Sequence, residues 1–258
     1  MSGGWILSLT PTLVGIGLVA GLMIGCVGVG GVILVPLLTF GCGVPVATAA
    51  AAAMMGYIAT GLTGTLLFGR SGAIDRKLAL ELCLGAAPGA LFGAWAIQLA
   101  NPVAVQILIA ALAAGAGVNS LSGRLRGSVE RCSLSTTGAV GIGVAIGIVS
   151  AMTGTGGPVV LVPLLMWLGF PVLAAVGLGQ AIQLPVAGLA TAGSYLVGSL
   201  DAHMGAQLAI GLVVGSVAGA KLAHGVTEKT LHATAALILV ATGVMVVLRL
   251  FASSLPGV

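Results

Sequence analysis

The stretch that decides the fold runs from Thr10 to Phe40 and reads TPTLVGIGLVAGLMIGCVGVGGVILVPLLTF. It contains no charged side chain, and it is longer than the roughly 20 apolar residues that a membrane-spanning helix needs. Its apolar residues do not alternate with polar ones, which excludes a strand of a membrane β-barrel. A cluster of glycines at Gly28, Gly30 and Gly31 weakens helix continuity. The stretch therefore predicts membrane-embedded helix that is interrupted by glycine.

The rest of the chain has the same character. Of its 258 residues, 59% are hydrophobic and 5% are charged, whereas soluble domains carry about 25% charged residues. This composition excludes a soluble globule, and it also excludes a disordered chain, which is poor in apolar residues. The apolar runs cover residues 10–40, 44–69, 78–100, 102–121, 134–168, 171–199, 204–220 and 230–248, and their one charged side chain is Glu81, near the start of the third run. We therefore expect an all-α, multi-pass protein of the inner or plasma membrane with about eight membrane runs.

The second half of the sequence repeats the first at an offset of 126 residues. The matched segments are Val14–Gly17 with Val140–Gly143, Gly28, Gly30 and Gly31 with Gly154, Gly156 and Gly157, and, after the additional Pro158, Leu34–Leu38 with Leu161–Leu165. Self-similarity at a fixed offset is the mark of a repeated structural unit. We predict an internal duplication within one integral membrane domain, with a first transmembrane repeat at 1–125 and a second at 126–258.

Two topologies fit this pattern. With eight simple crossings, seven of the nine basic residues, including Arg70, share one side with both termini, and Lys221 and Lys229 lie opposite. The positive side is cytoplasmic, and the two halves would be parallel. If the runs 10–40 and 134–168 each form two short crossing helices, the chain has ten spans in two inverted five-pass repeats. We expect eight crossings and keep the ten-span arrangement as the alternative.

The repeated glycine cluster is where a binding site is expected. Backbone that is freed from helix pairing inside a bilayer is tolerated only when it is buried in protein or lines a cavity. A helix that begins there presents unpaired N–H groups and partial positive charge, which suit an anion. Pro158 directly after Gly157 is typical of the first turn of a new helix. Two such breaks predict a transporter site where the halves meet, and glycine-mediated helix packing is the alternative.

The element G-x-G-G, followed in the second copy by proline and in both by x-x-x-V-P-L-L, resembles that of the TauE/SafE family of sulfite and organosulfonate transporters. The resemblance covers residues 12–250 and includes the size and the sparse charge. It implies a membrane transporter for sulfite, a sulfonate such as sulfoacetate, or another small anion, mostly working by export. The first copy departs from the second, with Val29 in place of Thr155 and no proline after Gly31. We therefore expect the second half to contribute more of the polar groups.

Polar side chains deep in the runs agree with that asymmetry. Gln180 and Gln183 are three residues apart and share one helix face. Hydroxyls punctuate the run 44–69 at Thr60, Thr63 and Thr65. Amides, hydroxyls and helix N-termini can replace the water around a sulfonate, and hydrogen bonding between helices is the alternative. The predicted substrate-binding residues are Gly28, Gly30, Gly31, Tyr57, Thr153, Gly154, Thr155, Gly156, Gly157, Gln180 and Gln183.

Two further patterns predict structure rather than function. Glycines four residues apart form matched stripes at Gly85, Gly89 and Gly93 and at Gly211, Gly215 and Gly219. Such stripes are typical of faces where membrane helices pack closely. Asp75 and Asp201 occupy the same place in each half, near helix starts. Because a carboxylate is stabilised at a helix N-terminus, we expect helix capping there rather than proton coupling.

We therefore expect a secondary transporter or facilitator, not an enzyme, that moves a small anion outward across the cytoplasmic membrane. Its expected partners are a small inorganic or organosulfur anion and membrane lipids, with no nucleic acid, cofactor or metal. The pattern is also compatible with a homo-oligomer. A membrane-embedded enzyme or maturation factor is the alternative, although such proteins need titratable or metal-binding groups within the spans. No Asp, Glu, Lys or Arg lies in the middle of any run.

Overall fold

The computed structural model describes residues 3–27, 31–101, 103–105, 107–108, 111, 134–223 and 244. Its helices are α1 (Gly3–Val27), α2 (Gly31–Pro36), the π-helical turn η1 (Leu37–Gly41), α3 (Val46–Arg70), α4 (Arg76–Leu99), α6 (Thr136–Thr153), α7 (Pro158–Trp167), α8 (Val172–Leu196) and α9 (Ala202–Ala223). Within these ranges the chain forms helices and no strand. Five helices, α3, α4, α6, α8 and α9, contain stretches long and apolar enough to cross a membrane. The expected all-α, polytopic class is confirmed.

Polar caps fix where several of these helices begin. The Asp75 carboxylate accepts the backbone N–H groups of Lys77 and Leu78 and so caps α4. In the second half, the Asp201 carboxylate accepts the backbone N–H of Met204 in the first turn of α9. Both carboxylates satisfy N–H groups that have no partner within the helix. The two aspartates therefore act as helix caps, as the sequence predicts.

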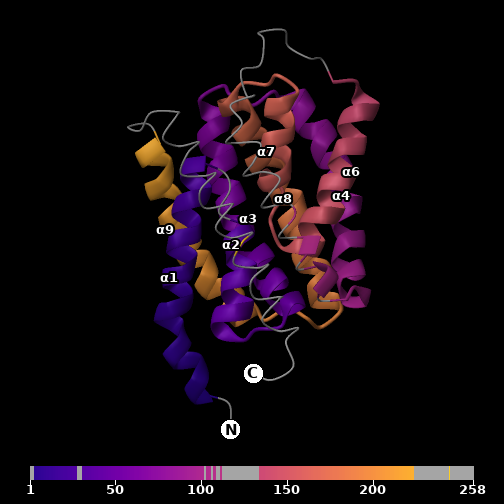
Figure 1. The fold of residues 1–258 in the computed structure, drawn as a ribbon. Coiled ribbons are helices and arrows are strands. Elements are labelled where there is room, and N and C mark those ends of the chain that lie inside the picture. The colour runs from indigo at the N-terminus through magenta and orange to yellow at the C-terminus, as the bar shows by residue number, and fades with distance from the viewer. Residues whose placement is uncertain are drawn as a thin grey trace.

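The helices are arranged as a central group between two outer pairs (Figure 1). Helices α3 and α8 pack against each other in the centre, with the short helices α2 and α7 beside them. Helix α1 packs along α9 on one flank, and α4 packs along α6 on the other. Each outer pair therefore joins one helix from the first half of the sequence to one from the second half.

The glycine stripes are the surfaces on which the outer pairs pack. A β-carbon added at Gly85 or Gly89 would collide with the carbonyl oxygen of Val140 or Val144 in α6. At Gly211 and Gly215 it would collide in the same way with the carbonyl oxygens of α1. Only the hydrogen of glycine leaves room for such close helix approach. The predicted packing role of both stripes is confirmed.

The same contacts give the relative directions of the helices. Residue numbers rise together where Gly85, Gly89 and Gly93 face Val140, Val144 and Ile148, so α4 and α6 are parallel. In the centre, α3 and α8 are antiparallel, because Gly64 lies against Gln180 whereas Phe68 lies against Gly177, nearer the start of α8. Helices α3 and α8 occupy corresponding places at the offset of 126 residues. The two halves therefore have opposite directions.

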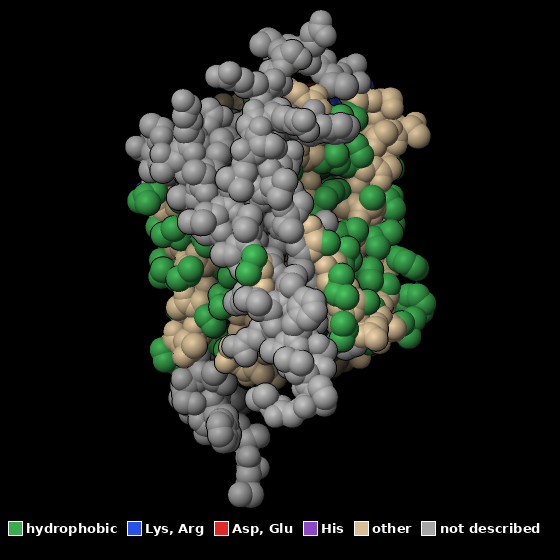
Figure 2. Space-filling view, in the orientation of Figure 1, with side chains coloured by type: hydrophobic (Ala, Val, Ile, Leu, Met, Phe, Trp, Pro, Cys, Tyr) green, Lys and Arg blue, Asp and Glu red, His purple; other side chains and the backbone are tan. Residues whose placement is uncertain are grey.

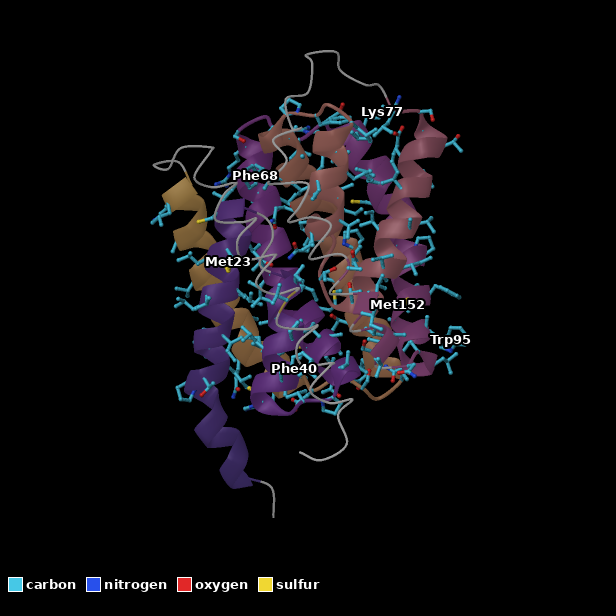
Figure 3. All side chains as sticks on the ribbon, viewed as in Figure 1. Met23, Phe40, Phe68, Lys77, Trp95 and Met152 are labelled. Carbon is cyan, nitrogen blue, oxygen red and sulfur yellow. The ribbon has the colours of Figure 1, made fainter. Side chains whose placement is uncertain are left out.

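The parallel arrangement expected for eight simple crossings is therefore wrong, and the directions agree with the inverted alternative. Helices α1 and α3 run the same way, so the chain must return through α2 and η1 between them. Figure 3 shows this return, with Met23 at mid-height and Phe40 at the end of the bundle opposite Phe68. The physical reason is that glycine divides the run 10–40 into two helices rather than one. The number of spans stays a prediction, because residues 112–133 and 224–243 lie outside the described part.

The inverted arrangement places one basic residue at a different end of the bundle from the end expected for eight crossings. Helices α3 and α9 both run toward the same end of the bundle, which places Lys221 near the end that carries Arg70, Arg76 and Lys77. All the basic residues in the described part lie at this end, which we call the basic end, and Lys77 and Phe68 mark it in Figure 3. The opposite end carries Asp201 and His203. The eight-crossing expectation that Lys221 lies opposite Arg70 is therefore wrong.

The outside of the bundle is apolar. Figure 2 shows hydrophobic side chains spread over the visible flanks. Among the large hydrophobic side chains that are more than half exposed are Leu84, Phe92 and Trp95 on α4 and Ile210 and Val214 on α9. An exposed apolar surface of this extent is unfavourable in water and suits the hydrocarbon core of a bilayer. The small alanines of α3 instead face the interior, where they allow α2 and α8 to approach closely.

Candidate functional site

The second glycine break is a short non-helical segment between α6 and α7. Gly154 ends α6 in the left-handed conformation, with φ +68°, and its N–H donates to the carbonyl of Ser150. Gly156 and Gly157 also have positive φ angles, of 81° and 103°. Residues that carry a side chain rarely adopt such φ angles, so glycine is required for the backbone to take this path. Helix α7 then begins at Pro158, as the sequence predicts.

The break is buried, and its threonines bond to each other. Thr153 and Thr155 are at most 2% exposed, and their hydroxyl oxygens lie 2.9 Å apart. The Thr153 hydroxyl also donates to the carbonyl of Val149 over 2.7 Å. In this structure the two hydroxyls are therefore engaged with the protein itself. Both residues lie at the second break, and their predicted contact with an anion stays a prediction.

The two breaks meet in the core of the protein. A β-carbon on Gly31, the first residue of α2, would collide with the carbonyl oxygen of Thr155. From the other side, a β-carbon on Gly154 would lie 2.6 Å from a methyl group of Val35. Glycine at both positions therefore allows the start of α2 to touch the segment between α6 and α7. Gly28 and Gly30 belong to the first break by sequence but lie outside the described residues.

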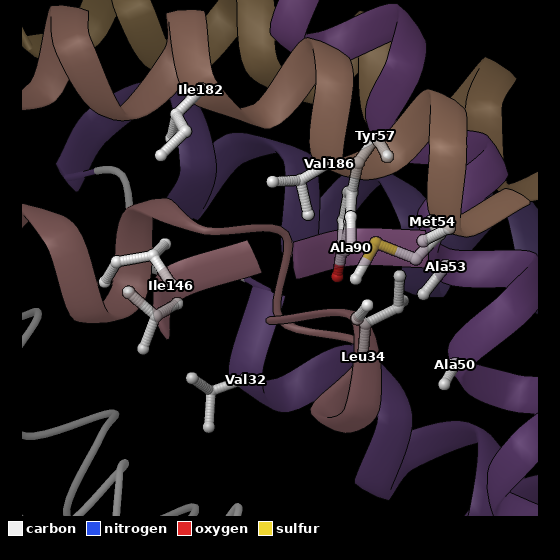
Figure 4. Close-up of a cluster of buried hydrophobic side chains, with 14 of the residues drawn as sticks. Val32, Leu34, Ala50, Ala53, Met54, Tyr57, Ala90, Ile146, Ile182 and Val186 are labelled. Carbon is white, nitrogen blue, oxygen red and sulfur yellow. The ribbon is translucent and has the colours of Figure 1, made fainter. Parts of the chain in front are cut away.

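Tyr57 connects the two breaks. Its hydroxyl donates to the carbonyl oxygen of Gly31 over 3.1 Å, and its ring lies against Gly156. The side chain is fully buried, and Figure 4 shows it among Met54, Leu34 and Val186. A buried phenol needs a hydrogen-bond partner, and here the partner is the carbonyl of the first residue of α2. Tyr57 therefore fastens α3 to both breaks at once.

The two glutamines of α8 differ in their contacts although they share one helix face. The Gln183 amide donates to the Tyr57 carbonyl over 3.1 Å and to the Thr60 hydroxyl over 2.7 Å. It is therefore an interhelical link between α8 and α3. Gln180 is only 2% exposed, and its buried Oε1 has no hydrogen-bond partner among the residues that the structure describes. Of the two predicted ligands, Gln180 is thus the one whose amide is free for a substrate.

The structure adds one polar residue that the sequence analysis did not single out. Ser150 of α6 is fully buried, and its hydroxyl oxygen has no partner among the described residues. A β-carbon placed on Gly157 would lie 3.9 Å from this oxygen, so the hydroxyl faces the second break. The signal in the sequence is a serine within an otherwise apolar run, one turn before the glycines. It was missed because serine inside a membrane helix commonly bonds to its own backbone.

Comparison with known proteins identifies this arrangement. The family model described as sulfite exporter TauE/SafE matches residues 13–246. The chain belongs to the TauE/SafE family. It is also 28% identical over 212 residues to the probable membrane transporter protein YdhB of Bacillus subtilis (strain 168), covering 79% of this chain and 86% of that protein. No solved structure matches the chain.

The TauE/SafE assignment confirms the resemblance inferred from the duplicated G-x-G-G element. The protein is a multi-pass transporter of the cell membrane and not an enzyme. Among the described residues there is no group of three or more His, Cys, Asp and Glu side chains arranged to hold a metal ion. In this TauE/SafE protein, the chemistry near the breaks therefore belongs to amides, hydroxyls and backbone groups.

Proposed function

We propose that this protein moves a sulfite or organosulfonate anion outward across the cytoplasmic membrane, with the anion held where the glycine breaks meet. The family supplies the class of small anion. The single observation that carries the site is the contact of Gly31 with Thr155, which joins the two breaks in the buried core. Backbone that is freed from helix pairing at this depth is the form that binding sites take in many transporters.

The groups available to the anion come mainly from the second half. The N–H of Gly157 lies at the start of α7, where the helix dipole favours negative charge. The Ser150 hydroxyl is buried beside it without a partner, and leaving such a group unpaired costs about 1–3 kcal/mol. An oxyanion that accepts this hydroxyl would remove that cost. Gly28, Gly30 and Gly31 would complete the site from the first half.

We also propose that the halves 1–125 and 126–258 arose by duplication and act as an inverted pair. Their packing contacts correspond at the offset of 126, since Gly85 faces Val140 and Gly211 faces Val14. Rocking of one repeat against the other around a fixed central site is a common way to alternate access. The basic end would face the cytoplasm, because Lys and Arg accumulate on that side of membrane proteins. Outward transport then starts from the basic end.

Purified protein in liposomes tests the proposal. We expect radiolabelled sulfonate or sulfite to cross with saturable kinetics, and Ser150→Ala to raise the half-saturating concentration. A hydrogen bond to a charged group is worth about 1.5–3 kcal/mol, so the rise should be roughly tenfold or more. Thr191→Val is the matched control, because it removes another buried, unpartnered hydroxyl that lies in α8. It should leave the flux unchanged.

The positive φ angles of the glycines in the second break limit which substitutions can test the site. At Gly157 a β-carbon would meet only Ile182 within 3.4 Å, but the φ of 103° is unfavourable for any side chain. A loss of flux in Gly157→Leu therefore counts only if the protein is still inserted and monodisperse. Wild-type flux in Ser150→Ala and in a well-inserted Gly157→Leu protein would show that the anion binds elsewhere.

A further inference from the structure

A small pocket lies between the breaks and the basic end of the bundle. It is formed by four helices, α1, α3, α8 and α9, and lined by Ile24, Gly25, Thr60, Thr63, Gly64, Leu67, Phe68, Gln180 and Ser216. Leu67 and Phe68 belong to the last turn of α3, which ends at Arg70. The pocket therefore extends from the middle of α3 toward the basic end.

Gln180 is the reason to regard this pocket as a binding site. Gln180 lines the pocket and is 2% exposed, and within the described part of the chain its buried Oε1 has no hydrogen-bond partner. A buried amide without partners is destabilising by an amount comparable to a lost hydrogen bond. Gly64 leaves the space that this side chain occupies, since a β-carbon there would lie 2.6 Å from Oε1. The protein therefore buries the Gln180 amide at a cost in free energy, in a space that Gly64 leaves open for it.

The hydroxyls of the pocket are available to the same ligand. Thr63 donates to the carbonyls of Ala59 and Thr60, and Ser216 donates to the carbonyl of Val213. These carbonyls belong to α-helices and already accept backbone N–H groups, so the hydroxyls lose little by turning to a better acceptor. A half-turn of the Gln180 amide presents its NH2 group in place of its oxygen. Three neutral donors can then converge on one oxyanion.

Side-chain contacts link the pocket to the breaks. Thr60 lines the pocket, and its hydroxyl accepts a hydrogen bond from the Gln183 amide, which also donates to the carbonyl of Tyr57. Tyr57 in turn contacts Gly31 and Gly156. Along α8, Gln180 is about one helical turn from Gln183. The pocket therefore lies close to the breaks within the bundle.

Three polar residues of the pocket have apolar counterparts in the other half. At the offset of 126 residues, Gln180 corresponds to Met54, Thr63 to Leu189 and Ser216 to Ala90. Met54 and Ala90 are buried in the hydrophobic core, and Figure 4 labels both. Two apolar residues of the pocket instead have polar counterparts, because Ile24 corresponds to Ser150 and Phe68 to Ser194. The amide and the two hydroxyls that can donate to an anion in the pocket are therefore not repeated at the corresponding place, which carries the Ser150 hydroxyl of the second break.

We propose that this pocket, which in this structure has room for about one water molecule, widens to bind a singly charged oxyanion that enters from the basic end, before the anion reaches the breaks. The proposal rests on the transport function proposed above and adds a second site and a charge preference to it. The nine residues that line the pocket are uncharged. The Born cost of burying an ion grows with the square of its charge, so a dianion costs about four times as much as a monoanion of the same size. Neutral donors can offset the smaller cost but not the larger one.

Thiol protection tests the pocket without relying on transport. Thr63→Cys is introduced into protein whose four native cysteines are replaced, and its reaction rate with N-ethylmaleimide is measured. Methanesulfonate, a permanent monoanion, should slow the reaction about tenfold at ten times its dissociation constant. Sulfate, a dianion of similar size, should slow it less than twofold at the same ionic strength, by the charge argument. Leu189→Cys, at the corresponding place of the other half, is the matched control and should show no protection.

Two variants connect the protection to Gln180. Gln180→Met supplies the residue of the corresponding position, and Gly64→Ala displaces the Gln180 amide from its place. Each should abolish protection of Thr63→Cys in monodisperse protein. If methanesulfonate crosses the membrane but gives no protection, the pocket proposal is overturned while the transport function stands. Protection without flux would instead sustain the pocket and contradict the transport function. Equal protection by sulfate would overturn the charge preference.

Discussion

The hydroxyl of Tyr57 donates to the carbonyl oxygen of Gly31, and this single bond ties the central helix α3 to the start of α2. The ring of the same residue lies against Gly156 in the second break. The two breaks are 126 residues apart in the sequence, yet one side chain contacts both. The geometry at the breaks therefore depends on α3 as well as on the glycines themselves.

Tyr57→Phe should destabilise the protein. The substitution keeps the ring but removes the hydrogen bond to the Gly31 carbonyl, and a hydrogen bond contributes about 0.5–1.5 kcal/mol to stability. We expect a lower midpoint of unfolding, measured by thermal denaturation in detergent. Tyr195→Phe is the control, because Tyr195 is 72% exposed and should change the midpoint little. An unchanged midpoint in Tyr57→Phe would mean that the bond does not hold the breaks together.

The two glutamines of α8 should respond in opposite ways. Gln183→Leu removes two hydrogen bonds to α3 and should lower stability by about 1–3 kcal/mol. Gln180→Met removes a buried amide that has no protein partner, so stability should stay the same or rise. Denaturation of both variants, measured beside sulfonate flux, distinguishes them: Gln180→Met should impair flux without destabilising the protein. Equal destabilisation by both would mean that Gln180 also has a structural role.

Alanine substitution of neighbouring glycines should separate packing from helix propensity. A β-carbon at Gly143 of α6 would collide with the Leu82 carbonyl, whereas at Gly141 nothing lies within 4 Å. Gly143→Ala should therefore separate α4 from α6 and destabilise the protein by about 1–3 kcal/mol, the usual cost of overpacking. Gly141→Ala should be neutral or stabilising by up to about 1 kcal/mol, because alanine favours the helix. Thermal denaturation of the pair checks both values.

The glycines show how much of the fold can be predicted from the sequence. Their spacing predicts the packing stripes, because glycine repeated every four residues must lie on one helix face. The clusters at Gly31 and Gly154–Gly157 predict breaks, because glycine and proline both weaken a helix. The direction of the halves does not follow from these patterns. A broken run can cross the bilayer once or turn back, and the charge bias fits both topologies. The choice depends on tertiary contacts such as that of Gly64 with Gln180.

The candidate site could likewise be predicted only in part from the sequence. Polar residues in an apolar run are visible in any sequence, so Gln180 and Gln183 could both be predicted as candidates. Only the structure shows that Gln183 bonds to Thr60, whereas the Oε1 of Gln180 has no partner among the described residues. Ser150 escaped notice because its hydroxyl normally bonds to the helix backbone, and only the structure shows it unpartnered beside the break. Whether a polar side chain finds a hydrogen-bond partner depends on contacts between helices that are far apart in the sequence. The spacing of residues along one helix does not reveal these contacts.

The orientation of the bundle can be tested with two single cysteines at opposite ends. Ser71 follows α3 at the basic end, and Ala202 begins α9 at the other end. Both residues are exposed. If the basic end faces the cytoplasm, as we propose, a membrane-impermeant maleimide should label Ala202→Cys but not Ser71→Cys in intact cells. Permeabilised cells provide the control in which both label. The reverse labelling pattern would show that the basic end faces the outside of the cell.

The last prediction concerns the driving force. No Asp, Glu, Lys or Arg lies in the middle of any membrane run, where the residues of proton and cation coupling usually lie. A membrane potential of about 100 mV, negative inside, is worth about 2.3 kcal/mol per elementary charge. For an internal monoanion this favours the outside roughly fifty-fold at equilibrium. We therefore expect electrogenic efflux that follows the voltage.

The measurement uses proteoliposomes in which potassium and valinomycin set the potential and no pH difference is imposed. Methanesulfonate is the informative substrate, because it keeps its single charge across the physiological pH range, whereas sulfite takes up a proton near neutral pH and can carry it across. The potential should drive methanesulfonate toward the positive side, and reversing the potassium gradient should reverse the flux. For sulfite, the rate should also rise as the pH falls toward the range of the monoanion, since the pocket near Gln180 favours a single charge. If methanesulfonate ignored the potential and followed an imposed pH gradient instead, the transporter would be proton-coupled, and a titrating group would have to be sought on the chain.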